Sequence, residues 1–261
     1  MDFGLRATVA VVTGGASNIG RAISRELADE GAVVAIVDRD RPMAERTVDD
    51  IIASGGRAAV FECDLTDVDA TAAVMQDVEA DLGPIGTLVN NVGWNGTAGF
   101  FLDLPPERWI RAFELNLLST LGATRAALPA MVERRGGSIV SIASDAAFGE
   151  FRMGDYGPMK AGVMSFSRTI AKEYGRYGIR SNVICPGLVI PGADDIGEGS
   201  LWQGDTGFGD KEIADMERSI PLRRRPEAAD VAAAVAFFAS SRAALLTGQV
   251  LSVSGGFAMP R

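Results

Sequence analysis

The sequence contains no histidine and only two cysteines. Without histidine, a Ser-His-Asp triad, an HExxH metalloprotease motif and any histidine-ligated metal are excluded, so we expect no metal site. Cys63 and Cys185 lie far apart and form neither a CxxC motif nor a disulfide framework. They are typical of two buried thiols in a reducing compartment.

Long apolar runs are also missing. No stretch approaches the ~18 residues that a membrane-spanning helix needs. The N-terminal residues combine an early acid with a five-residue apolar run, which is not the pattern of a signal peptide. The net charge of -9 and pI near 4.7 argue against a nucleic-acid or anionic-membrane partner. We expect a soluble cytoplasmic protein with a small-molecule substrate.

Seven short apolar runs alternate with helical patterns along the 261 residues. Each run is almost continuously apolar, as in parallel strands that are covered on both faces. This order predicts one α/β domain over 1–261, a Rossmann-type doubly wound parallel sheet of about seven strands with helices on both faces. The seven runs cover residues 8–12, 32–37, 57–62, 87–90, 137–142, 179–184 and 249–253.

A glycine-rich turn, "TGGASNIGRAI" at 13–23, follows the first predicted strand and opens the first helix. Gly14 and Gly20 would let the backbone approach a pyrophosphate, which a helix N-terminus attracts. Asn18 stands where a third glycine is usual, and asparagine tolerates a left-handed backbone. The alternative is a simple strand-to-helix turn.

Asp38 ends the second predicted strand, eighteen residues after Gly20. A carboxylate there accepts hydrogen bonds from an adenosine ribose and repels a 2′-phosphate, which favours NAD over NADP. The alternative is a solvated turn residue. Arg39 could meet a phosphate, but the carboxylate at the strand end should dominate.

Tyr156 and Lys160 stand four residues apart in "GDYGPMKAG", which places them one turn apart on one helix face. A free tyrosine has a pKa of about 10. A lysine ammonium within ~4–6 Å would lower this pKa by about 1–3 units, and a cationic nicotinamide would add to the effect. The phenol would then serve as the general acid or base in a chain without histidine. The alternative is a surface pair.

Taken in order, the motifs resemble those of the classical short-chain dehydrogenase/reductases from end to end. They are "TGGASNIG", "CDLTD" (63–67), "NNVG" (90–93), "ELNLLST", "SIASDAA", "YGPMK", "CPGLVIP" (185–191) and "LTGQVLSVSGG" (246–256). Three positions depart from the family pattern: Asn18 replaces a glycine, Pro191 a threonine and Ser254 an aspartate.

The resemblance implies the role of each site residue. Tyr156 would transfer the proton, Lys160 would also bind the nicotinamide ribose, and Ser144 would hold the substrate oxygen. Asn116 would shape its helix to hold a water that links Lys160 to solvent. The expected cofactor-binding residues are Gly14, Ser17, Asn18, Ile19, Gly20, Asp38, Asp64, Leu65, Asn91, Gly93, Tyr156, Lys160, Pro186, Gly187 and Val189.

Aromatic residues near the expected acceptor site favour an apolar, cyclic or aromatic substrate. We expect Trp94, Phe151 and Trp202 to contact it together with Ser144, although part of this set could pack the core. The acidic, glycine-rich stretch at 190–218 is expected to form a substrate loop. Several motifs resemble 2-hydroxycyclohexanecarboxyl-CoA dehydrogenases, and Arg223–Arg225 could meet a CoA phosphate or form an exposed basic turn.

Three functions stay open. The first is an NAD-dependent oxidoreductase that interconverts a secondary alcohol and a ketone, on a cyclic or aromatic and possibly CoA-linked substrate. The second is an NADPH-dependent 3-oxoacyl reductase of fatty-acid type, and the third a non-catalytic nucleotide-binding protein. Family members usually form homotetramers through paired long helices, here expected at 105–134 and 156–177.

Overall fold

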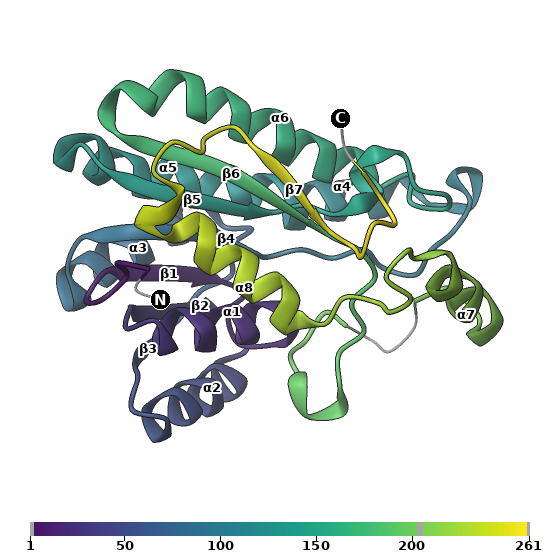
Figure 1. Ribbon diagram of the computed structural model, residues 1–261, viewed down its shortest axis with the longest axis horizontal. Coiled ribbons are helices and arrows are strands. Elements are labelled where there is room, and N and C mark those ends of the chain that lie inside the picture. The colour runs from purple at the N-terminus through teal and green to yellow at the C-terminus, as the bar shows by residue number, and fades with distance from the viewer. Residues whose placement is uncertain (1–2, 203–205, 260–261) are drawn as a thin grey trace.

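The computed structural model describes residues 3–202 and 206–259, and its centre is one sheet of seven parallel strands. The strand order is β3-β2-β1-β4-β5-β6-β7 (Figure 1). The strands are β1 (Val9–Thr13), β2 (Val33–Asp38), β3 (Arg57–Glu62), β4 (Ile85–Asn90), β5 (Gly137–Ile142), β6 (Ile179–Pro186) and β7 (Val250–Val253). The predicted fold is confirmed, and each strand begins and ends within two residues of its predicted run.

Helices cover both faces of the sheet because every crossover between parallel strands passes over a face. On one face lie α1 (Asn18–Asp29), α2 (Arg41–Ala53) and α8 (Ala228–Ala239), with α1 packed beside α8. On the other lie α3 (Val68–Leu82), α5 (Ser119–Arg134) and α6 (Gly157–Tyr174). The apolar side chains of the strands fill a core on each face, which explains their continuous rather than alternating patterns.

The predicted long helix at 105–134 is divided into three parts. It consists of α4 (Pro106–Phe113), one π-helical turn (Glu114–Leu118) and α5. Such a turn inserts one residue into the helical ladder and is frequent at functional sites. The π-helical turn carries Asn116, so the irregularity falls on a predicted site residue.

The stretch at 190–218 is more ordered than a plain loop. A short 3-10 turn (Ala193–Asp195) follows β6, and the helix α7 (Asp210–Ser219) ends the stretch. This region lies beyond the carboxyl ends of the strands, with α7 at the right of Figure 1. Residues 203–205 of the predicted substrate loop are outside the described residues. Among the described helices, none is both long and apolar enough to cross a membrane.

Candidate active site

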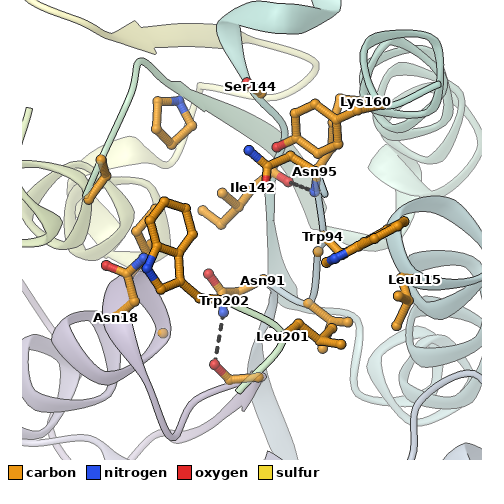
Figure 2. Close-up of a pocket in the computed structure, with 18 of the residues that line it drawn as sticks. Asn18, Asn91, Trp94, Asn95, Leu115, Ile142, Ser144, Lys160, Leu201 and Trp202 are labelled. Atoms are coloured by element: carbon orange, nitrogen blue, oxygen red, sulfur yellow. Dashed lines mark hydrogen bonds between the residues drawn. The ribbon is translucent and has the colours of Figure 1, made fainter. Parts of the chain in front are cut away.

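A cavity of about 310 Å³ opens at the carboxyl ends of the strands. The strand order reverses between β1 and β4, and ligands of doubly wound sheets bind at such a reversal. In the view of Figure 2, Ser144 and Lys160 lie at one end of the cavity, with Trp94 on one side and Trp202 and Asn18 on the other. The cavity therefore joins the predicted dinucleotide and proton-transfer residues.

The glycine-rich turn connects β1 to α1. Gly14 has a φ of 61°, and a Cβ at Gly20 would lie 1.9 Å from the Gly14 carbonyl oxygen. Neither position can therefore take a side chain without moving the backbone. Asn18 has a φ of 45°, which confirms that asparagine adopts the left-handed conformation here. Ser17, the N-cap residue, and Ile19 line the cavity together with these three.

Asn91 and Gly93, which follow β4, contact the glycine-rich turn and Lys160, respectively. Asn91 Nδ2 donates to the carbonyl oxygens of Thr13 and Gly14 at 3.1 and 2.9 Å. A Cβ at Gly93 would lie 2.8 Å from Lys160 Nζ and 3.0 Å from Asn116 Oδ1. The lysine can therefore reach its position only because residue 93 has no side chain.

Two carboxylates line the part of the cavity beside the glycine turn. Asp38, at the end of β2, accepts hydrogen bonds from the backbone N–H groups of Ala16 and Asp40, both at 3.0 Å. Burial raises the Asp38 pKa although these hydrogen bonds lower it. Asp64 accepts from the Thr66 backbone N–H, which lowers its pKa, and Leu65 is buried beside it. Asp38 thus lies in the same part of the cavity as the glycine-rich turn, as the sequence predicts.

Lys160 is held by the end of the neighbouring strand. Its side chain is only 2% exposed, and Nζ donates to the Ile142 carbonyl oxygen at 2.9 Å (Figure 2). Burial lowers its pKa from 10.5 to about 8, because the charged ammonium loses its hydration. Its backbone N–H donates to the Tyr156 carbonyl oxygen, as the four-residue spacing predicts.

Tyr156 begins α6 beside Lys160, and Lys160 Nζ lies 5.7 Å from the centre of the phenol ring. The expected lowering of the Tyr156 pKa is wrong for the protein alone. Burial raises the pKa to about 12, although a hydrogen bond with Ser144 acts in the opposite direction. Loss of hydration outweighs the Ser144 hydrogen bond, so the neutral phenol is favoured in the protein alone.

Ser144 lies just beyond β5, at the start of a 3-10 turn (Asp145–Phe148). The Ala146 backbone N–H donates to Ser144 Oγ at 3.1 Å, which fixes the hydroxyl oxygen in the turn. Ser144, Tyr156 and Lys160 all line the cavity. The structure therefore brings together the three side chains that the sequence predicts for proton transfer.

Asn116 explains the π-helical turn. Its Nδ2 donates to the carbonyl oxygens of Ala112 and Trp94, at 2.9 and 2.8 Å, and its Oδ1 accepts from the Trp94 backbone N–H at 2.9 Å. The side chain is fully buried. Asn116 therefore joins the interrupted helix to the segment that follows β4, and this positions Trp94 at the cavity.

The Trp94 ring is held by two cations of α4. The guanidinium groups of Arg108 and Arg111 lie 5.5 and 4.9 Å from the ring centre. Arg108 in turn pairs with the buried Asp155 at 2.6 Å. By contrast, Phe151 is 60% exposed, packs edge-on against Phe100, and is not among the described residues that line the cavity. The structure therefore does not bring Phe151 to the cavity with Trp94 and Ser144, and its predicted contact with the substrate stays a prediction.

The segment 190–218, the predicted substrate loop, forms part of the cavity wall. It contributes Gly199, Ser200, Leu201, Trp202, Phe208 and Met216 to the cavity lining. Pro186, Gly187 and Val189 line the cavity where the chain leaves β6, and Gly187 N–H donates to the Val253 carbonyl oxygen at 3.1 Å. Pro191 is not among the described lining residues, so its missing hydroxyl does not alter this wall.

The sequence-based prediction missed several cavity residues, among them Asp145, Glu150 and Phe257. It also missed Arg21, which is 8% exposed and binds the substrate loop through the Asp194 carbonyl oxygen at 2.7 Å and Asp195 Oδ1 at 3.2 Å. Asp145 directly follows Ser144, which was an available signal. Arg21 also pairs with Asp50 of α2 at 2.6 Å. Asp194 and Asp195 are more than 170 residues away from Arg21 along the chain, and no local pattern indicates them.

The fold and the site together define an alcohol dehydrogenase or ketoreductase with a nicotinamide dinucleotide cradle. A family model described as enoyl-(acyl carrier protein) reductase matches residues 14–258. The chain is 33% identical over 257 residues to 2,3-dihydro-2,3-dihydroxybenzoate dehydrogenase of Bacillus subtilis, covering 97% of each chain. It is 35% identical to (3R)-3-hydroxyacyl-CoA dehydrogenase of Mus musculus, covering 98% of each.

Among solved structures, NAD+-bound xylitol dehydrogenase resembles the chain with a TM-score of 0.89 and 29% identity. The match covers 97% of this chain and 100% of that one. The chain belongs to the classical short-chain dehydrogenase/reductase family.

Proposed function

We propose that this protein is an NAD-dependent oxidoreductase that interconverts a secondary alcohol and a ketone on a neutral, cyclic or aromatic substrate. One observation carries the proposal: Ser144, Tyr156 and Lys160 line the same cavity as the glycine-rich turn and Asp38. Acid–base residues and a dinucleotide cradle in one cavity fit hydride transfer better than binding alone, which disfavours the non-catalytic alternative.

The residues fit a nicotinamide dinucleotide. Gly14 and Gly20 allow the tight turn that opens α1, whose N-terminus would attract the pyrophosphate. Asp38 would accept hydrogen bonds from the hydroxyl groups of the adenosine ribose. The cofactor supplies the carrier for the hydride, and its oxidised ring is cationic. Asp38 would repel a 2′-phosphate, so we propose NAD rather than NADP, and this disfavours the NADPH-dependent 3-oxoacyl reductase.

Proton transfer rests on the chain's own residues. In ketone reduction, neutral Tyr156 would donate its proton to the oxygen that Ser144 holds, which suits its raised pKa. In alcohol oxidation, the same phenol must first lose its proton. The buried Lys160 ammonium favours that loss, since a positive charge close to a phenol stabilises its anion.

The lining of the cavity limits the substrate. Trp94, Leu115, Met153 and Phe208 supply an apolar wall, which suits a ring. Two acidic residues, Asp145 and Glu150, are also among the lining residues, and their negative charge would repel an anionic group on the substrate.

The arginine run at 223–225 gives little support to a CoA-linked substrate. Arg224 pairs with Asp230 at 2.6 Å, and Arg225 lies 3.7 Å from Glu217. Arg223 donates to the Arg218 carbonyl oxygen. These contacts support the exposed basic turn, because two of the three charges already have a carboxylate partner.

We also propose a homotetramer in the cytoplasm, as is usual in the family. Large exposed apolar side chains occur in two separate regions: Phe101, Leu102, Ile110 and Phe113 lie on and before α4, and Phe237, Leu245 and Leu251 lie near α8 and β7. A tetramer with D2 symmetry needs at least two kinds of interface, which two such regions could supply. The two cysteines are free and buried, as in a reducing compartment. Light scattering coupled to gel filtration measures the subunit number.

A substrate screen tests the enzymatic proposal. Matched cyclic alcohols that are neutral, carry a carboxylate or are linked to CoA are offered with NAD and with NADP, and nicotinamide absorbance is followed. We expect turnover of the neutral alcohols with NAD. Preference for NADP would contradict the role of Asp38, and preference for the carboxylates would contradict the proposed substrate class. Absence of turnover with every pair would contradict the enzymatic proposal itself.

A further inference from the structure

A buried carboxyl group lies beside the catalytic serine without a role in proton transfer. Asp145 is only 6% exposed, and its Oδ1 accepts a hydrogen bond from Ser252 Oγ at 3.0 Å. Its Oδ2 is buried and has no hydrogen-bond partner of normal geometry among the described residues. A buried polar atom that lacks a hydrogen-bond partner calls for an explanation.

The hydrogen bonds continue from Asp145 into the last described residues of the chain. Ser252 Oγ lies 2.7 Å from Ser254 Oγ, and Ser254 Oγ accepts from the Ala258 backbone N–H at 3.2 Å. The Phe257 backbone N–H donates to the Ser254 carbonyl oxygen at 3.3 Å. Phe257 itself lines the cavity. Asp145 is thus connected, through two hydroxyl groups, to a wall of the active site.

The groups around Asp145 do not favour a charged carboxylate. Its pKa is raised to about 6, mainly by burial; the hydroxyl groups of Ser252 and Ser254 oppose this shift, and the negative charge of Glu150 adds to it. The Cys185 thiol faces it from β6, and the cations Lys160 and Arg168 of α6 act on that thiol. No cation contributes to the pKa of Asp145 in the described part of the chain. Ionisable groups kept in such surroundings are concentrated at functional sites.

We infer that Asp145 is a positioning residue of the active site: its carboxylate holds Ser252 and Ser254, and through them fixes the segment 254–258 that places Phe257 in the cavity wall. Protonation weakens this hold, because a neutral carboxyl accepts hydrogen bonds less strongly than a carboxylate. The cavity is therefore fully formed above about pH 6 and loosens below it. The inference rests on the proposed function only for its consequence in catalysis.

Ketone reduction is the direction in which to test it. Tyr156 stays protonated at neutral and acidic pH, so a fall in kcat/KM below about pH 6 belongs to another group. We expect this fall in the wild type. In Asp145→Asn it should be absent, with kcat/KM at neutral pH reduced about tenfold or more, since small misplacements of a cavity wall are costly.

Two further variants test the hydrogen-bond chain and the charge around Asp145 separately. Ser252→Ala breaks the chain between Asp145 and Ser254, so kcat/KM at neutral pH should be reduced as in Asp145→Asn and the fall below about pH 6 should be absent. Glu150→Gln keeps the chain and removes a charge that raises the Asp145 pKa, so the fall should begin at lower pH. A merely structural Asp145 would produce neither the loss of pH dependence in Ser252→Ala nor the shift in Glu150→Gln. Coincident pH profiles for all four proteins would overturn the inference.

Hydrogen exchange tests the positioning without any turnover. Above about pH 6, the amides of 254–258 should exchange faster in Asp145→Asn than in the wild type at the same pH. Equal exchange would overturn the inference even in an active enzyme. Thermal unfolding checks that the variant folds. The difference between the Tm of Asp145→Asn and that of the wild type should increase by a few degrees as the pH rises through about 6, because only the wild type then has a buried negative charge at position 145. If the wild type turns over no substrate but the exchange differs, the proposed function fails and the positioning stands.

Discussion

The proton-transfer residues and the substrate loop meet at one cavity, but different forces hold them. Tyr156 and Lys160 belong to a buried helix end, packed against β5 and the π-helical turn. The substrate loop is attached by a few polar contacts, among them Arg21 to Asp194 and Gly199 to Asp40. Buried ionisable groups lower the free energy of unfolding, whereas ion pairs with partly exposed carboxylates change it little. Arg21 is buried, but the carboxylates of Asp50 and Asp195 that it pairs with are partly exposed. We therefore expect a substitution of Lys160 to lower activity and raise stability, whereas a substitution in the loop contacts should change stability little.

The largest effect is expected from Lys160→Met, which keeps the length of the side chain and removes its charge. Turnover should fall by about 10²–10⁴-fold, as is typical when acid–base catalysis is lost. The same variant should be more stable at pH 7, by about 3 kcal/mol, because folding lowers the Lys160 pKa from 10.5 to about 8.

The pH dependence of that gain follows from the direction of the pKa shift. The folded chain binds the Lys160 proton less tightly than the unfolded chain, so the penalty is present below about pH 8 and lost by about pH 10.5. Thermal unfolding across this range measures it. A Tm gain that does not shrink as pH rises would contradict a charged, buried Lys160.

Asp38→Ala should produce the next largest effect, on the choice of cofactor. Removing the carboxylate takes away the repulsion of a 2′-phosphate, so the preference for NAD over NADP should narrow by about tenfold or more. Asp64→Ala is the matched control, since it should weaken both cofactors alike. The test measures the dissociation constants of NAD and NADP for the wild type and both variants. An unchanged preference for NAD in Asp38→Ala would show that another residue selects NAD.

The smallest effect concerns the substrate loop, which we propose is mobile in the free enzyme and closes over cofactor and substrate. Arg21→Met removes the contacts to Asp194 and Asp195 and also the ion pair with Asp50 of α2. Hydrogen exchange at 194–200 should become faster, while the Tm stays within a few degrees. Arg25→Met, one turn further along α1 on its exposed side, should change neither. Strong protection of this segment in every protein, with and without NAD and substrate, would instead indicate a rigid loop.

The same division appears in what the sequence could predict. The short apolar runs and their alternation with helical patterns predicted the seven strands. The glycine-rich turn and the Tyr156–Lys160 spacing predicted the residues at the two ends of the cavity. These features were predictable because they depend on local geometry. The direction of the Tyr156 pKa shift was not predictable, since it depends on burial by distant segments. The π-helical turn, the Arg21 contacts and the Asp145 hydrogen bonds likewise join residues far apart in the chain.

Tyr156→Phe tests the central claim most directly, because it removes one hydroxyl group and keeps the ring. NAD affinity and turnover are measured on the same preparation, with a substrate from the screen. The account predicts that NAD affinity is retained and that turnover falls by about 10²–10⁴-fold. Near-normal turnover in this variant would contradict the assignment of the phenol as the group that transfers the proton.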